Sequence, residues 1–263
     1  IIASFLPIGA ISHIYYADRL NQLPLAIFGI ALGIVLLPSL SKAIKQSDQE
    51  TTNNIQNRSI EFSLLISLPS AIGLFILAQP IIYILFERGA FLEEDTFYTA
   101  KVLSYFALGL PAYIIIKVLV SCFFAREDTK TPLYISIVSV ITNVVLSLLL
   151  IGSMREMGIA VATAISAWVN ALLLYLFLAI RNHMKFDDLL VRNSIKILLS
   201  SFLLFLGIYV LNGLFFTNIS GNSVLLNSAL LLLMIFLAII IYFGLVIVLK
   251  VLSVNQLREY LKK

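Results

Sequence analysis

Long apolar runs separated by short polar segments dominate the pattern of this chain. Six runs of about 22–26 residues each have the length of a tilted helix across a bilayer. They lie at Phe62–Phe86, Val102–Ala125, Leu133–Met154, Gly158–Ile180, Ile195–Ile219 and Val224–Leu249. Together with the longer stretch Ile8–Ser41, they predict seven complete membrane crossings in an all-α polytopic bundle. We expect Ile1–Leu6 to be the end of a further helix.

The stretch Ile8–Ser41 is apolar at both ends and polar in its middle. As one helix it would be roughly 50 Å long, against roughly 30 Å of bilayer hydrocarbon. It must therefore tilt, bend or break, and Pro24 is the natural place because proline removes an intrahelical hydrogen bond. A charged side chain at membrane depth costs at least about 2.5–3.5 kcal/mol unless it finds water or a partner. We therefore predict that Arg19 lies on the wall of a wet cavity.

The composition supports a membrane protein. The chain is 60% hydrophobic and 12% charged, whereas a soluble domain has about 25% charged residues. It opens on Ile1 within an apolar run, without the charged region or cleavage site of a signal peptide. We therefore expect it to be the C-terminal part of a longer chain. The single Cys122 excludes an intrachain disulfide framework.

The charges of the loops predict the orientation. Of the 18 Lys and Arg residues, 13 fall in one set of alternate loops, and the opposite set holds only Arg88, Lys101 and Arg155. Because cytoplasmic loops are enriched in Lys and Arg, the C-terminus is expected in the cytoplasm. The thirteen are Lys42, Lys45, Arg58, Arg126, Lys130, Arg181, Lys185, Arg192, Lys196, Lys250, Arg258, Lys262 and Lys263.

Two cations, Arg19 and Lys117, remain at membrane depth with no loop to hold them. Lys117 could instead extend its ammonium group toward the interface. For Arg19 the alternative is neutralisation by Asp18, but adjacent residues on a helix point about 100° apart. Residues three and four positions earlier share the face of Arg19, so the rings there offer cation–π contacts. We predict a substrate-binding set of Arg19, Lys117, Tyr15, Tyr16 and Gln22, and a plain interfacial position for His13.

Polar side chains recur in two consecutive predicted helices: Thr142, Asn143, Ser147, Thr163, Ser166 and Asn170. We expect most of them to make hydrogen bonds between helices, beside small residues that allow close packing. Neutral oxygens of Asn143, Ser147 and Thr163 could form a weak cation site, but no Asp or Glu lies between Asp128 and Glu156 to complete it. Sodium coupling is therefore weakly supported.

No signature of a soluble enzyme is present. The sequence has no Walker A motif, no HExxH, no paired Cys or His cluster and no GxSxG. We therefore predict neither an enzyme nor a cofactor. Anionic membrane lipids account for the basic loops, so no nucleic acid partner is predicted.

Several blocks of sequence together resemble the MurJ (MviN) family. Tyr15–Leu20 (YYADRL), Leu23-Pro24, Gly29–Gly33 (GIALG) and Leu37–Ser41 (LPSLS) look like its eighth transmembrane helix. A later helix and loop of the family resemble Lys117–Leu119 and Phe123–Pro132 (FFAREDTKTP), and Phe86–Phe91 (FERGAF) also fits. These blocks keep the order and spacing of the family over about residues 1–168, whereas the last two helices match only in position and character.

The resemblance implies a fourteen-helix exporter of the multidrug/oligosaccharidyl-lipid/polysaccharide superfamily, working by alternating access in the bacterial cytoplasmic membrane. The family flips lipid II, the undecaprenyl-pyrophosphate-linked peptidoglycan precursor, to the outer leaflet. On that map, residues 1–181 are the C-terminal six-helix lobe with a truncated first helix. Residues 182–263 are two additional helices, forming a groove for the lipid tail, and a cytoplasmic C-terminus. Arg19 corresponds to the family's arginine in helix eight, and the N-terminal lobe would be the missing partner.

Other assignments stay open. We place gate or hinge positions at Pro24, Gly29 and Arg126. A polysaccharide-repeat flippase or a drug/cation antiporter of the same superfamily is the alternative function, and Asp18 is the only deep carboxylate that an antiporter could use. A structural scaffold for cell-wall assembly is the third hypothesis.

Overall fold

The computed structural model describes residues 6–215 and 223–251, except for the side chains of residues 28–34 and 224. The expected end of a helix at Ile1–Leu6 therefore lies almost wholly outside the described residues. Within them the chain forms nine helices: α1 (Ala10–Lys45), α2 (Gln49–Ile76), α3 (Ala78–Phe86), α4 (Glu93–Ala107), α5 (Leu110–Phe124), α6 (Lys130–Met154), α7 (Glu156–Ile180), α8 (Asp188–Phe215) and α9 (Val224–Val248). The prediction of an all-α bundle is confirmed.

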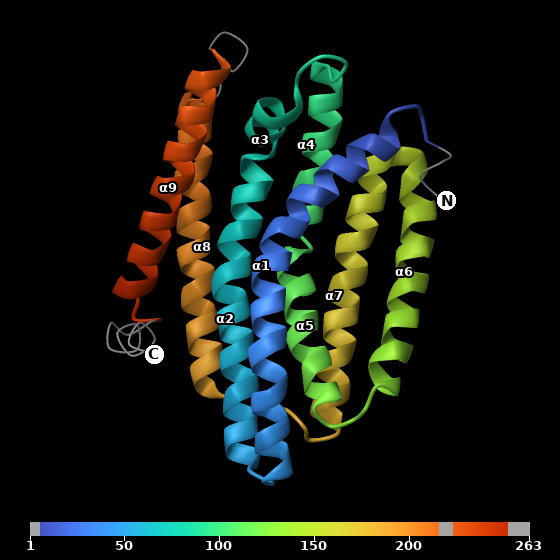
Figure 1. The fold of residues 1–263 in the computed structure, drawn as a ribbon, viewed down its shortest axis with the longest axis vertical. Helices are drawn as coiled ribbons and strands as arrows, with labels where there is room; N and C mark the ends of the chain where they lie inside the picture. The colour runs from blue at the N-terminus through green and yellow to red at the C-terminus, as the bar shows by residue number, and fades with distance from the viewer. Residues whose placement is uncertain (1–5, 216–222, 252–263) are drawn as a thin grey trace.

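Six stretches in the described part of the chain are long and apolar enough to cross a membrane. They are α2, the combined segment of α4 and α5, and α6, α7, α8 and α9. Helix α1 has 36 residues and runs from one end of the molecule to the other (Figure 1). This arrangement matches the apolar runs of the sequence, with two interruptions inside them.

The first interruption separates α2 from α3 at Leu77, and the second separates α4 from α5 at Leu108 and Gly109. Pro111 follows the second break in the first turn of α5, where its missing N–H costs nothing and its ring disfavours a helix before it. Helix α2 also begins earlier than its apolar run. The Asp48 side chain caps it by accepting a hydrogen bond from the backbone N–H of Thr51 at 2.9 Å.

Helix α1 bends along its length, so that its first part leans across α7 and its second part runs beside α2 and α5 (Figure 1). It stays helical through both Pro24 and Pro38. A proline inside a helix removes one hydrogen bond of the backbone ladder and favours bending there. The expectation that this long stretch tilts, bends or breaks is met by a bend without a break.

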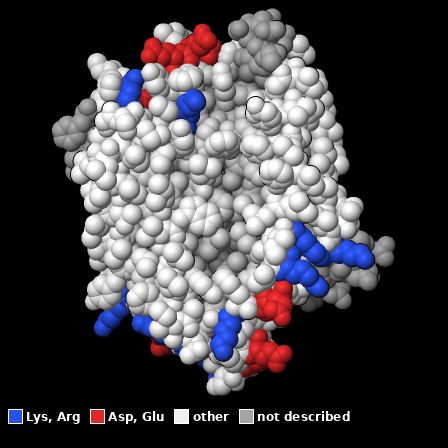
Figure 2. All heavy atoms as spheres, turned by 180° about the vertical axis from the view of Figure 1, so that it is seen from behind, with Lys and Arg blue, Asp and Glu red and all other residues white. Residues whose placement is uncertain are grey.

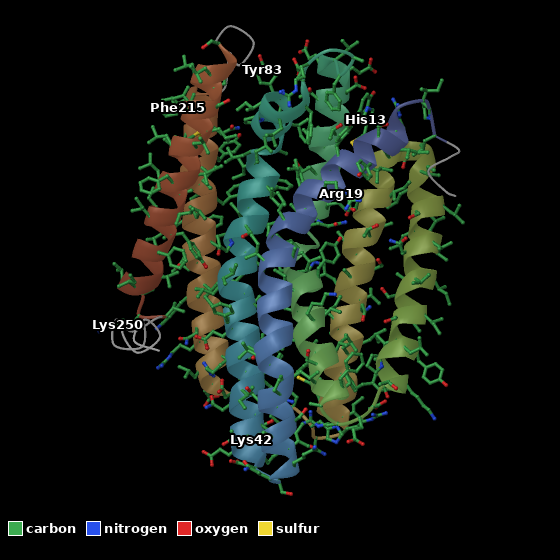
Figure 3. The ribbon with its side chains drawn as sticks, in the orientation of Figure 1. His13, Arg19, Lys42, Tyr83, Phe215 and Lys250 are labelled. Carbon is green, nitrogen blue, oxygen red and sulfur yellow. The ribbon has the colours of Figure 1, made fainter. Side chains whose placement is uncertain are left out.

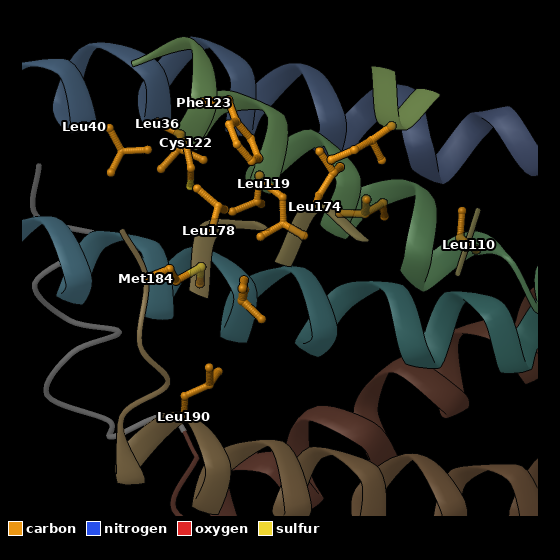
Figure 4. Close-up of a cluster of buried hydrophobic side chains, with 14 of the residues drawn as sticks. Leu36, Leu40, Leu110, Leu119, Cys122, Phe123, Leu174, Leu178, Met184 and Leu190 are labelled. Carbon is orange, nitrogen blue, oxygen red and sulfur yellow. The ribbon is translucent and has the colours of Figure 1, made fainter. Parts of the chain in front are cut away.

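The three largest apolar clusters among the described residues hold the helices together. The first joins Leu36 and Leu40 of α1 to α5 and α7 through Leu119, Phe123 and Leu178 (Figure 4). A second joins α8 and α9 to α2 and α3, and a third joins α1 to α3 and α4. Helix α6 packs chiefly on α7, and its other faces are largely exposed.

The ends of the bundle carry the charges. The α1–α2, α5–α6 and α7–α8 connections lie at one end, and the α3–α4 and α6–α7 connections lie at the other (Figure 1). We call these the α1–α2 end and the α3–α4 end. Figure 2 shows Lys, Arg, Asp and Glu gathered toward both ends of one face, with an uncharged band between them. The band agrees with a protein that spans a membrane several times.

Candidate functional site

A cavity of about 480 Å³ opens midway along α1, between α1, α4, α5 and α7. Asp18, Asn21, Gln22, Leu25 and Ala26 of α1 form one wall, because positions 18, 21, 22 and 25 share one face of a helix. The facing residues are Phe106, Tyr113, Lys117 and Thr163. The cavity therefore combines an acid, an amine, two amides and two hydroxyls at membrane depth.

Arg19 lies at the edge of this cavity. It is exposed, and Figure 3 shows it on α1 between His13 and Lys42. Its guanidinium carbon is 4.8 Å from the centre of the Tyr15 ring, as predicted from their spacing. Its Nη1 donates to Oε1 of Gln22 at 3.4 Å, and Gln22 also donates to Asp18. Gln22 thus connects Arg19 to the cavity wall, although Arg19 does not itself line the cavity.

The cations of this region form no direct ion pairs with the residues that the structure describes. Neither Arg19 nor Lys117 takes part in an ion pair with any residue that the structure describes. Two cavity-lining oxygens, Oδ1 of Asn21 and the hydroxyl of Tyr113, are buried without a hydrogen-bond partner in the described part of the chain. A buried polar atom without a partner is costly, so the cavity is suited to a polar ligand.

The remaining predicted site residues fall into different surroundings. Tyr16 packs on the rings of Phe86 and Phe91, at 4.7 and 5.6 Å between ring centres. Its ring is therefore engaged in an aromatic cluster beside the α3–α4 connection rather than with Arg19. Pro24 is half-buried on α1, one turn past the cavity-lining Asn21. Gly29 falls among residues 28–34 and lies outside the described side chains.

Arg126 lies at the α1–α2 end. Its guanidinium donates to the backbone carbonyls of Cys122 at 2.8 Å and His183 at 2.9 Å, so it joins the end of α5 to the α7–α8 connection. Partial burial lowers the pKa of Arg126 from its usual value. Burial, followed by the nearby positive charges of Arg126 and Arg181, lowers the pKa of His183. A second cavity of about 370 Å³ lies here, lined by Arg126, His183 and residues of the α1–α2 turn.

The polar side chains of α6 and α7 hold these two helices together. Nδ2 of Asn143 donates to Oγ1 of Thr163 at 3.0 Å and to Oγ of Ser166 at 3.3 Å. Ser139 Oγ donates to the Ser166 carbonyl at 2.8 Å. The predicted hydrogen bonds between helices are confirmed for Asn143, Thr163 and Ser166. The prediction is wrong for Thr142, whose hydroxyl donates to Val138 of its own helix. Ser147 is buried nearby, and its hydroxyl has no partner among the described residues.

Sequence reasoning missed a polar cluster at the α3–α4 end. His13 lies near the end of its helix, as expected, but it is only 5% exposed and is not a plain interfacial histidine. Its Nδ1 lies 3.0 Å from Oε1 of Glu156, and its Nε2 lies 2.9 Å from Oδ1 of Asp95. The partners are 143 and 82 residues away in sequence, and no local pattern connects them. Asn21, by contrast, could have been found from its helical spacing to Asp18 and Gln22.

These features define a class. The chain is a multi-pass helical membrane protein with a polar cavity and cations without direct ion pairs among the described residues, the arrangement of a membrane transporter.

The comparisons with known proteins give the family. Residues 1–230 match the family model described as lipid II flippase MurJ. The chain is 40% identical over 256 residues to a probable lipid II flippase MurJ of Rhizobium tropici, covering 97% of this chain and 48% of the relative. It is also 40% identical over 255 residues to the protein of that name from Rickettsia prowazekii, covering 97% and 50%. The chain belongs to the MurJ lipid II flippase family.

A solved structure agrees with this assignment. The protein titled lipid II flippase MurJ, inward closed conformation, matches with a TM-score of 0.77 and 28% identity over 93% of this chain and 48% of its own. The resemblance noted in the sequence is confirmed, and the alternative exporters of the superfamily are not favoured. The chain spans about half the length of these two curated relatives.

Proposed function

We propose that this chain is the C-terminal half of a flippase that moves lipid II from the inner to the outer leaflet of the bacterial cytoplasmic membrane by alternating access. The family membership and the names of the relatives support this substrate. The half-length match supports an N-terminal lobe as the partner of this chain. In this proposal residues 1–181 are the C-terminal lobe and residues 182–263 are the additional pair of helices with the C-terminal segment.

The unpaired cations beside the cavity carry the proposal. A pyrophosphate that crosses the bilayer interior must exchange its water for other favourable contacts. A guanidinium can donate two parallel hydrogen bonds to phosphate oxygens, and an ammonium adds a second charge. Neither Arg19 nor Lys117 forms an ion pair with a described residue, although the Asp18 carboxylate lines the same cavity. Gln22 and Tyr15 orient Arg19, and Tyr16 supports the same helix by packing.

The additional helices are suited to the lipid tail. Helices α8 and α9 lie side by side at one edge of the molecule (Figure 1), attached through the apolar cluster with α2 and α3. Their outer faces carry large exposed apolar side chains, among them Leu203, Leu206, Leu232 and Phe236. A polyprenyl chain requires only an apolar surface.

The basic loops support a cytoplasmic α1–α2 end and a cytoplasmic C-terminus. Alternating access would use the bend of α1, with Pro24 and Gly29 as the proposed hinge positions. Arg126 would act as a gate at the cytoplasmic end, since it joins two connections there. Asn143, Ser147 and Thr163 would offer neutral oxygens to a coupling cation.

A leaflet-specific assay tests the proposal. The complete flippase containing this chain, reconstituted in vesicles, should move labelled lipid II between leaflets. Arg19→Ala should abolish this movement, and Lys42→Ala, an exposed lysine on the same helix, should not. Vesicles in which the native protein leaves lipid II in its original leaflet would contradict the function, and a scaffold role would then replace it.

A further inference from the structure

The buried cluster at the α3–α4 end lacks a hydrogen-bond donor for one of its contacts unless it binds an additional proton. Both ring nitrogens of His13 face carboxylate oxygens, Asp95 on one side and Glu156 on the other. A neutral imidazole has one N–H, so it can donate to only one of the two, and the other nitrogen then presents a lone pair to an oxygen. An imidazolium donates to both. One added proton therefore completes both hydrogen bonds.

The net charge of the cluster also favours an additional proton. Asp95 and Tyr98 of α4 face His13. Glu156 of α7 also faces it, and Arg155, which precedes α7, contacts Glu156. With neutral His13, the cluster contains two carboxylates and one arginine, and its net charge is −1. With protonated His13 the cluster is neutral. Glu156 has 0% exposure, and a buried carboxylate is costly unless it is paired and hydrogen-bonded.

Arg155 cannot replace this proton. Its Nε lies 3.4 Å from Oε2 of Glu156, and that oxygen has no hydrogen bond from any described residue. Its guanidinium instead lies over the Tyr98 ring at 4.4 Å and donates to the Tyr98 hydroxyl at 2.9 Å. The Tyr98 ring in turn stacks on His13, with 5.7 Å between ring centres. Arg155 thus encloses the cluster but leaves His13 as the donor to Glu156.

The cluster is not arranged for a metal ion. The two carboxylates contact opposite nitrogens of one ring, so the three groups do not converge on a common point. Within the described residues, no group of His, Cys, Asp and Glu side chains could hold a metal. The ligand that fits is a proton, and Asp95, the most exposed of the three side chains at 32%, is its route from solvent.

The cluster joins three helices where α1 leans across the bundle. His13 is in the first turn of α1, Asp95 is in the first turn of α4, and Glu156 begins α7. Asp95 also caps α4 by accepting the backbone N–H of Leu92 at 2.8 Å, so its position is fixed. We propose that His13, Asp95 and Glu156 form a proton-binding latch that holds the first part of α1 against α4 and α7 when protonated and releases it when the proton leaves. In the orientation proposed above, the latch senses the pH outside the cytoplasm.

Spin-label distances in the complete flippase test this latch independently of lipid II. Labels at Ile11→Cys on α1 and Lys101→Cys on α4, both exposed positions, report the latch in a background with Cys122→Ala and no other native cysteine. The distance should be short and narrowly distributed at pH 5.5, and longer or broader at pH 8.5. The distance between control labels at Lys45→Cys and Lys185→Cys, at the α1–α2 end, should not change with the protonation of this cluster.

Three variants separate the latch from a purely structural cluster. H13Q should lose the response to pH, because an amide cannot donate on both sides. E156Q should keep the short distance at both pH values, because the side-chain amide introduced there can donate to neutral His13, whose one N–H then serves Asp95. H183Q, at the other end of the lobe, should retain the native response. A native distance that is the same at pH 5.5 and 8.5, or an E156Q protein that responds to pH as the native one does, would overturn the proposal.

Discussion

Two sites on α1, six residues apart, differ in whether a cationic side chain is paired with carboxylates. At His13 both ring nitrogens face carboxylates, and the side chain is buried between α4 and α7. At Arg19 the guanidinium is exposed, and its contacts are a tyrosine ring and a neutral amide. The first arrangement joins three helices, whereas the second leaves the guanidinium without a direct ion pair among the described residues. The proposed substrate-binding role therefore falls on Arg19 and not on His13.

The largest expected effect is at the unpaired cations. Arg19→Ala in the complete flippase should abolish support of growth in cells depleted of their own flippase, while insertion into the membrane stays normal. Arg19→Lys should restore activity only in part, since an ammonium cannot donate to phosphate through a planar fork. Lys117→Ala should weaken function less than Arg19→Ala. Normal growth with Arg19→Ala would show that this cation does not serve the substrate.

Substitution of an ion-paired residue, Asp187, should lower the stability of the fold. Asp187 accepts two hydrogen bonds from Arg58 of α2, and its Oδ1 caps α8 by accepting the backbone N–H of Leu190 at 2.6 Å. Asp187→Ala should destabilise the protein by about 1–2 kcal/mol through loss of the cap and of a partly exposed ion pair. Thermal unfolding in detergent measures this change. The neighbouring exposed Asp188→Ala is the control, and equal losses in the two variants would contradict this role.

Loss of hydrogen bonds between uncharged side chains should lower the stability less. Asn143→Ala removes two hydrogen bonds between α6 and α7, each worth about 0.6 kcal/mol in a membrane protein. The expected loss is therefore about 1 kcal/mol, measured by the same unfolding assay. Thr142→Ala is the matched control because its hydroxyl bonds only to its own helix, at the Val138 carbonyl. An unchanged Asn143→Ala protein would show that these bonds do not hold the two helices.

The smallest effect is a response to acid at the α1–α2 end. Hydrogen bonds from the side chain and backbone of Thr131, with Arg181 adding to them, lower the pKa of Asp128 to about 2. Since the folded pKa is below the unfolded value, this contribution is complete above the unfolded pKa of 3.8 and disappears as pH falls toward about 2. Unfolding scans of the native protein and Asp128→Asn should therefore converge in strong acid. A constant difference from pH 4 to pH 2 would contradict this.

The fold was largely predictable from the sequence, because apolar runs of membrane length leave few alternatives. The breaks at Leu77 and at Leu108 were not foreseen, since each depends on one or two residues within a run that reads as continuous. Arg19 and Lys117 were found as charges without a loop to hold them. Tyr113 and the partners of His13 were not, because helices distant in sequence bring them to their sites.

Binding of lipid II to the purified complete flippase tests the central claim most directly. If the unpaired cations hold the pyrophosphate, Arg19→Ala should weaken binding by about 10- to 100-fold, the equivalent of one charge-assisted contact. Lys42→Ala should bind as the native protein does, and Lys117→Ala should fall between them. Equal affinities in all four proteins would contradict the account, because charge at membrane depth would then have no part in holding the headgroup.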